Sequence, residues 1–136
     1  MIVNWEKLRS IEGMIVVVED DPMLSELIAE ILGEIGLKSI SFGTADDALT
    51  HLINSGQRCA LVIADHGVPG QIKGIEFIEM VQGRWPAIKA ILTSGYLVDP
   101  LDVPKSAIYL HKPWSLDQMV TAVASLLQPD NPIQKR

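Results

Sequence analysis

The stretch Cys59-Ala-Leu-Val-Ile-Ala-Asp65 is an apolar run that ends in an acid, and the turn sequence Val68-Pro69-Gly70 follows it. A second apolar run, Met14 to Val18, ends in the acids Glu19 and Asp20. Both runs are short and rich in β-branched residues, which indicates buried strands. Because the carboxyl ends of parallel strands lie at one edge of a sheet, where open α/β folds bind ligands, we expect these three carboxylates to lie close together.

Two more predicted strands, Ile88–Thr93 and Ile108–Leu110, bring a hydroxyl at Thr93 and an ammonium at Lys112 to the same edge. Three carboxylates, a hydroxyl and a lysine are the parts of a magnesium-assisted phosphoryl-acceptor site. An aspartate carboxylate can attack phosphorus to give an aspartyl phosphate. Magnesium prefers six oxygen ligands, which come from one or two carboxylates, water and phosphate. Asp20 and Asp65 can bind the ion directly, and the longer Glu19 is expected to act through a water.

Helical patterns fill the intervals between the strands. The predicted helices begin at Asp21-Pro22, at Thr44, before Phe77 and at the capping box Ser115–Gln118, and the first two end at Gly36 and Gly56. This alternation predicts an α/β flavodoxin-like fold, a doubly wound five-stranded parallel sheet of order 2-1-3-4-5. Pro100 and Pro104 leave residues 97–107 room for little more than one turn, so a shortened fourth helix is expected.

The chain of 136 residues has the length of one domain. We expect a lead-in over residues 1–13, in which Trp5 and Leu8 form one turn, a domain over 14–128 and a frayed tail over 129–136. The net charge of −6 argues against nucleic-acid binding, which needs a clustered basic face.

Membrane insertion is not expected either, because no apolar run approaches the ~18 residues of a membrane span. The chain has a single cysteine, Cys59, and its first residues carry charges where a signal peptide would have an apolar core. These features predict a cytoplasmic protein.

Four motifs in this order resemble the response-regulator receiver domain of two-component signalling. They are Val16-Val-Val-Glu-Asp-Asp-Pro22, Ile63-Ala-Asp-His-Gly-Val-Pro-Gly70, Ile91-Leu-Thr-Ser-Gly95 and Tyr109-Leu-His-Lys-Pro113. The resemblance implies that Asp65 is the phosphoacceptor and that Glu19 and Asp20 are the acidic pair that binds Mg²⁺. It also implies that Thr93 is the switch hydroxyl, Lys112 the lysine of the family's site and Tyr109 the aromatic switch residue, with a cis peptide bond after Lys112.

By the same resemblance, the chain takes a phosphoryl group from a histidine kinase or a histidine phosphotransfer protein. It then changes conformation and controls a downstream protein that the sequence does not identify. Such a domain is not an enzyme in the usual sense, since it catalyses only its own phosphorylation and dephosphorylation.

Three features depart from the common receiver pattern. The loop from Asp65 to Gly74 is one residue longer, as in receivers attached to hybrid kinases. The short interval between Thr93 and Tyr109 puts in doubt dimerisation through the surface that contains the fourth helix. Glycine at positions 67 and 95, which flank the site, leaves attack by water on an acyl phosphate sterically open.

Several alternatives compete with a signalling receiver. The chain could be a phosphoryl sink, or a receiver-like scaffold that is never phosphorylated. An aspartate-dependent phosphatase would need a second acid two residues after Asp65, where Gly67 is found. A flavodoxin would need a phosphate-binding loop after the first strand, where Glu19, Asp20 and Asp21 would repel phosphate. His66 invites a catalytic role, but residues at that position in receivers are normally not catalytic.

Overall fold

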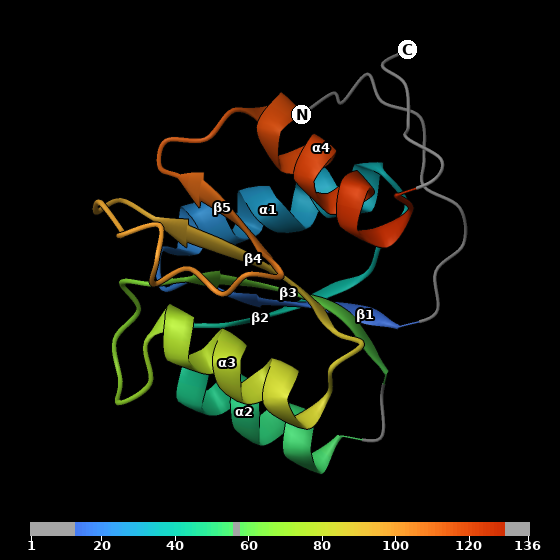
Figure 1. The fold of residues 1–136 in the computed structure, drawn as a ribbon. Coiled ribbons are helices and arrows are strands. Elements are labelled where there is room, and N and C mark those ends of the chain that lie inside the picture. Colours follow the sequence, from blue (N-terminus) through green and yellow to red (C-terminus); the bar gives the residue numbers. More distant parts are fainter. Residues whose placement is uncertain (1–12, 56–57, 130–136) are drawn as a thin grey trace.

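The computed structural model describes residues 13–55 and 58–129, which form a three-layered α/β/α fold (Figure 1). Its sheet has parallel strands in the order β2-β1-β3-β4-β5, as the sequence predicts. The strands are β1 (Met14–Val18), β2 (Ser39–Phe42), β3 (Cys59–Asp65), β4 (Lys89–Ser94) and β5 (Ala107–His111). The predictions for the lead-in, for Gly56 and for residues 130–136 of the tail lie outside the described residues.

Within the described part of the chain, four helices cover the sheet in pairs: α1 (Pro22–Glu34) and α4 (Leu116–Leu127) pack on one face, and α2 (Ala45–Asn54) and α3 (Gly74–Arg84) on the other (Figure 1). Side chains of β1 alternate between these two cores, and because both faces are buried the strand has a continuous apolar sequence. None of the helices in the described ranges has the length and apolar character needed to cross a membrane.

Local capping signals fix where α1 begins and ends. The Asp21 carboxylate accepts hydrogen bonds from the backbone N–H groups of Met23 and Leu24, and Pro22 takes the first helical position. Gly36 follows the helix with φ +88°, a left-handed conformation that glycine adopts without steric cost. The helix therefore starts directly after Glu19 and Asp20, and this holds the two acids at the edge of the sheet.

The segment between β4 and β5 differs in detail from the expectation. Residues 95–106 form turns and irregular backbone, so the expected short helix is absent from this interval. Pro100 and Pro104 cannot donate backbone hydrogen bonds, and the Asp99 carboxylate accepts a hydrogen bond from the Leu101 N–H at 2.9 Å, which stabilises a turn. An exposed loop, which begins next to Thr93, therefore replaces the helix.

Candidate functional site

The ends of four parallel strands bring the predicted residues together. Asp65 is the last residue of β3, and it is the register partner of Thr93 on β4. Glu19 follows the end of β1, which pairs with β3, and Lys112 follows the end of β5, which pairs with β4. Residues that are far apart in sequence therefore lie at one edge of the sheet, as the strand order predicts.

The acids Glu19, Asp20 and Asp65 form a compact oxygen cluster. One carboxylate oxygen from each lies within 4.8 Å of the others. Glu19 and Asp65 are buried, with 4% and 6% of their surface exposed, whereas Asp20 is exposed. An all-oxygen set of this charge suits a hard divalent cation such as Mg²⁺, and the exposed side at Asp20 leaves room for the waters that this ion retains. The residues present therefore fit the expected metal.

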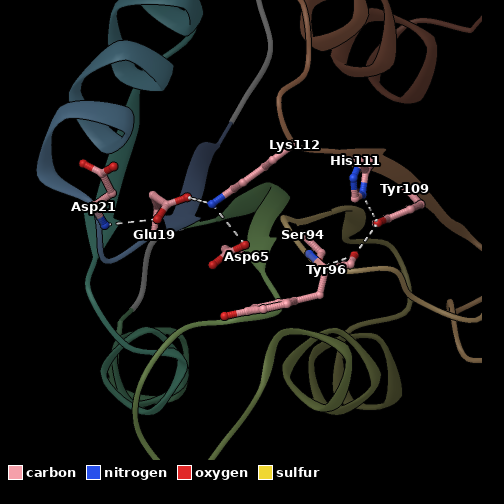
Figure 2. A network of polar contacts seen from close by, with 8 residues as sticks. All are labelled: Glu19, Asp21, Asp65, Ser94, Tyr96, Tyr109, His111 and Lys112. Carbon is pink, nitrogen blue, oxygen red and sulfur yellow. Dashed lines mark hydrogen bonds and ion pairs between the residues drawn. The ribbon is translucent and has the colours of Figure 1, made fainter.

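Lys112 joins two of these acids. Its Nζ atom lies 2.8 Å from Glu19 Oε1 and 3.2 Å from Asp65 Oδ1 (Figure 2). The peptide bond between Lys112 and Pro113 is cis, as the resemblance implied. The ammonium group of Lys112 pairs with two of the three carboxylates and carries one positive charge, so it leaves an excess of negative charge in the cluster that a divalent cation would offset.

Burial and charge shift the pKa values of the paired groups. The pKa of Glu19 is raised, because burial disfavours its carboxylate more than the hydrogen bonds from Lys112 and from the Asp21 backbone favour it. Burial of the ammonium group works to lower the pKa of Lys112. The hydrogen bond to Glu19 and the negative charge of Asp65 outweigh that effect, so the pKa of Lys112 is raised. Lys112 therefore stays positively charged at neutral pH.

Glu19 already uses both of its carboxylate oxygens. Oε1 accepts the hydrogen bond from Lys112, and Oε2 accepts one from the Asp21 N–H at 3.0 Å (Figure 2). The Asp20 carboxylate, by contrast, is exposed to solvent. This arrangement favours direct metal binding by Asp20 and Asp65 and an outer role for Glu19.

The two predicted switch residues lie differently with respect to Asp65. Thr93 is buried, with 2% of its surface exposed, next to Asp65 in the sheet. Tyr109 is half-buried, and its hydroxyl group lies 3.1 Å from the Tyr96 carbonyl oxygen and 2.9 Å from Nδ1 of His111. Figure 2 shows Tyr109 and His111 on the far side of the Tyr96 backbone from Asp65.

Sequence reasoning missed Tyr96, whose ring extends beside Asp65 (Figure 2). A Cβ atom built on Gly67 would lie 3.3 Å from Cε2 of this ring and 3.5 Å from Asp65 Oδ2. The space above Gly67, which was expected to be open, therefore contains an aromatic ring. The sequence feature that could have revealed this ring is the aromatic residue directly after Gly95, because the two glycines that flank the site leave space for a large side chain.

His66 has a structural partner. Its Nδ1 atom accepts a hydrogen bond from the Ile75 N–H at 3.3 Å, at the start of α3. This contact ties the end of β3 to the helix that follows.

Comparison with known proteins gives one consistent family. Residues 15–124 match the family model for the response regulator receiver domain. The hydrogenase transcriptional regulatory protein HoxA of Cupriavidus necator is 28% identical over 86% of this chain and 24% of its own length. The nitrogen assimilation regulatory protein NtrX of Azorhizobium caulinodans is 25% identical over 84% of this chain and 26% of its own length. The chain therefore spans about a quarter of the length of these relatives.

Solved structures share the fold. A CheY-like response regulator receiver domain protein from Methanospirillum hungatei has a TM-score of 0.77 at 22% identity, covering 88% of this chain and 96% of its own. The response regulator protein TrrA from Thermotoga maritima, solved in complex with Mg²⁺ and BeF, has a TM-score of 0.72 at 27% identity, covering 85% of this chain and 99% of its own.

Proposed function

This chain belongs to the response regulator receiver domain family of two-component signalling, and we propose that it accepts a phosphoryl group on Asp65 from a histidine kinase or a histidine phosphotransfer protein. Phosphorylation then changes its conformation and controls a downstream protein. The observation that carries this proposal is the arrangement around Asp65. Its buried carboxylate lies 3.2 Å from the Lys112 ammonium, in a cluster of three acids whose oxygens lie within 4.8 Å of one another.

The chemistry assigns a separate task to each group. An oxygen of Asp65 attacks phosphorus, the bond between phosphorus and the donor nitrogen breaks, and the nitrogen leaves with its electron pair. Lys112, fixed beside Asp65, donates a hydrogen bond to a phosphoryl oxygen and offsets its charge. Asp20 and Asp65 would hold Mg²⁺ directly and Glu19 would hold it through a water. When bound, the ion supplies the remaining positive charge beside the phosphoryl oxygens.

The conformational response is assigned to Thr93 and Tyr109. As the register partner of Asp65 in the sheet, Thr93 can donate its hydroxyl to a phosphoryl oxygen. Movement of Thr93 toward that oxygen opens space which the Tyr109 side chain can enter from its half-buried position. We also propose the division into lead-in, receiver and tail at residues 13 and 129, and a cytoplasmic location.

Intact mass spectrometry tests the phosphoacceptor. Wild-type protein incubated with Mg²⁺ and acetyl phosphate or phosphoramidate should gain one phosphoryl group, and hydroxylamine should remove it. Asp65→Asn should gain none, because the neutral amide is not a nucleophile. Asp102→Asn, which changes an exposed acid in the β4–β5 loop, is the matched control and should be labelled like wild type.

Two results separate the proposal from its alternatives. Undiminished labelling of Asp65→Asn, or no labelling of the wild type, contradicts the assignment, and the second result favours a scaffold that is never phosphorylated. Labelling without any structural change at Tyr109 favours a phosphoryl sink.

A further inference from the structure

We propose that the Tyr96 ring shields an aspartyl phosphate at Asp65 from water, and that Ser94 and Tyr109 fix the ring in this position. This inference rests on the proposed function, because it concerns the lifetime of the phosphoryl group on Asp65. Figure 2 shows the ring lying along one side of the Asp65 carboxylate, with the backbone of Tyr96 between Ser94 and Tyr109.

The absence of a side chain at Gly67 makes room for the ring. The position of a Cβ atom at Gly67 lies 3.3 Å from Tyr96 Cε2, closer than almost all real contacts of this kind, and 3.5 Å from Asp65 Oδ2. A side chain at residue 67 and the Tyr96 ring would therefore compete for the same space. A Cβ atom at Gly95 would meet no described atom within 4 Å, so that glycine gives the carboxylate no comparable cover. Tyr96 thus provides the aromatic cover on the Gly67 side.

Hydrogen bonds fix the Tyr96 backbone, from which the ring extends toward Asp65. The Ser94 hydroxyl donates to the Tyr96 carbonyl oxygen and accepts from the Tyr96 N–H, both at 3.0 Å. Ser94 itself is fully buried at the end of β4, so it is a rigid anchor. The Tyr109 hydroxyl donates to the same carbonyl at 3.1 Å. Tyr96 is 71% exposed, so few neighbours pack around its ring, and the fixed backbone sets the point from which the ring reaches the space beside Gly67 and Asp65.

The ring lies on the side of Asp65 that the lysine leaves open. Lys112 contacts Oδ1, while Oδ2 points toward the space beside Gly67 and Tyr96. Hydrolysis requires a water oxygen to attack phosphorus. The phosphorus–oxygen bond to Asp65 then breaks, the carboxylate leaves with the bonding pair, and the water gives up a proton to solvent. An apolar ring edge next to the phosphoryl group removes positions from which such a water can approach, so it slows this step.

Tyr109 connects the shield to the switch. In this structure its hydroxyl lies between the Tyr96 carbonyl oxygen and His111 Nδ1. If Tyr109 turns inward after phosphorylation, the Tyr96 carbonyl loses this donor and keeps its bond from Ser94. The same movement that signals the phosphorylated state would therefore loosen one of the contacts that fix the shield.

The test is the rate at which phosphoryl is lost after the small donor is removed by desalting, followed by intact mass. Tyr96→Ala should lose the group about threefold to tenfold faster than wild type, a change in barrier of about 0.7–1.4 kcal/mol. Tyr96→Phe keeps the ring and should match wild type. Tyr109→Phe should also lose the group at the wild-type rate, because Tyr109 of the phosphorylated wild type has turned inward and no longer donates to the Tyr96 carbonyl. Leu97→Ala, at an exposed neighbouring residue, is the matched control and should match wild type.

The outcomes separate this inference from the proposed function. If the wild type takes no phosphoryl group, the proposed function fails. If the wild type is labelled and Tyr96→Ala loses the group no faster, only the shield is disproved. A second measurement needs no variant: beryllofluoride with Mg²⁺ should shift the NMR signals of the Tyr96 ring protons in the wild type. Unchanged ring signals in a protein that binds beryllofluoride contradict the shield.

Discussion

Replacing Lys112 with methionine tests how the three acids are held together. The lysine binds Glu19 and Asp65, whose side chains are only 2% and 8% exposed, and its own side chain is 24% exposed. Removal of one partner from a buried ion pair typically costs 3–5 kcal/mol. Because water reaches Lys112, we expect a smaller loss of about 2–3 kcal/mol in the free energy of unfolding. For a domain of this size, that loss corresponds to a melting temperature lower by roughly 6–15 °C.

The effect of Lys112→Met should depend on pH in a defined direction. Burial raises the pKa of Glu19 in the folded protein above its value in the unfolded chain. Below the unfolded pKa, Glu19 is protonated in both states and its charge costs no stability. As pH rises through the folded pKa, Glu19 ionises in the folded protein and stability is lost. Removing Lys112 takes away two contributions that favour the Glu19 carboxylate, which raises this pKa further. The loss of stability should therefore be largest at neutral pH and should shrink at acidic pH, as Glu19 takes up a proton in the variant.

Urea unfolding of both proteins at several pH values, in EDTA, measures this difference. Lys38→Met, at an exposed lysine between α1 and β2, is the control and should change stability little. Added Mg²⁺ should restore part of the loss in Lys112→Met, because it supplies positive charge to the same cluster. A loss below about 0.5 kcal/mol, the range of ordinary surface substitutions, or one that is equal at all pH values would refute the reasoning.

Two further predictions concern the metal and the switch. Asp20→Ala should weaken Mg²⁺ binding, measured by isothermal titration calorimetry, more than Glu19→Ala does, because both Glu19 oxygens already accept hydrogen bonds; equal or reversed losses would overturn this division of roles. Thr93→Ala should still accept a phosphoryl group but lose most of the linked change at Tyr109, a coupling typically worth ~1–3 kcal/mol. Amide NMR shifts with and without beryllofluoride report this, and an unaltered response at Tyr109 in Thr93→Ala would disprove the switch.

Much of the site could be predicted because it depends on a simple regularity. Acids that directly follow short apolar strands lie at the carboxyl edge of a parallel sheet, so the sequence alone groups Glu19, Asp20 and Asp65. The cap at Asp21 was also predictable, because an aspartate followed by proline marks the start of a helix. The structure confirms both the cluster and the cap.

The rest depends on contacts that no local pattern encodes. The bond between Lys112 and Glu19 joins residues 93 positions apart, across strands that are not neighbours in the sheet, so its geometry depends on the side chains and not on register. The path of residues 95–106 depends on Ser94, Tyr96 and Tyr109 bonding to one another, and loop conformations of this kind follow from tertiary contacts. The position of the Tyr96 ring results from that loop.

The most direct test of the central claim is to locate the phosphoryl group on Asp65. Borohydride reduces an aspartyl phosphate to homoserine, and cleavage after Arg58 and Lys73 releases a peptide, residues 59–73, in which Asp65 is the only acid. After incubation with Mg²⁺ and a small phosphodonor, tandem mass spectrometry of the reduced protein should find homoserine at position 65 of this peptide. Homoserine at another acid, with the 59–73 peptide unchanged, would contradict the account.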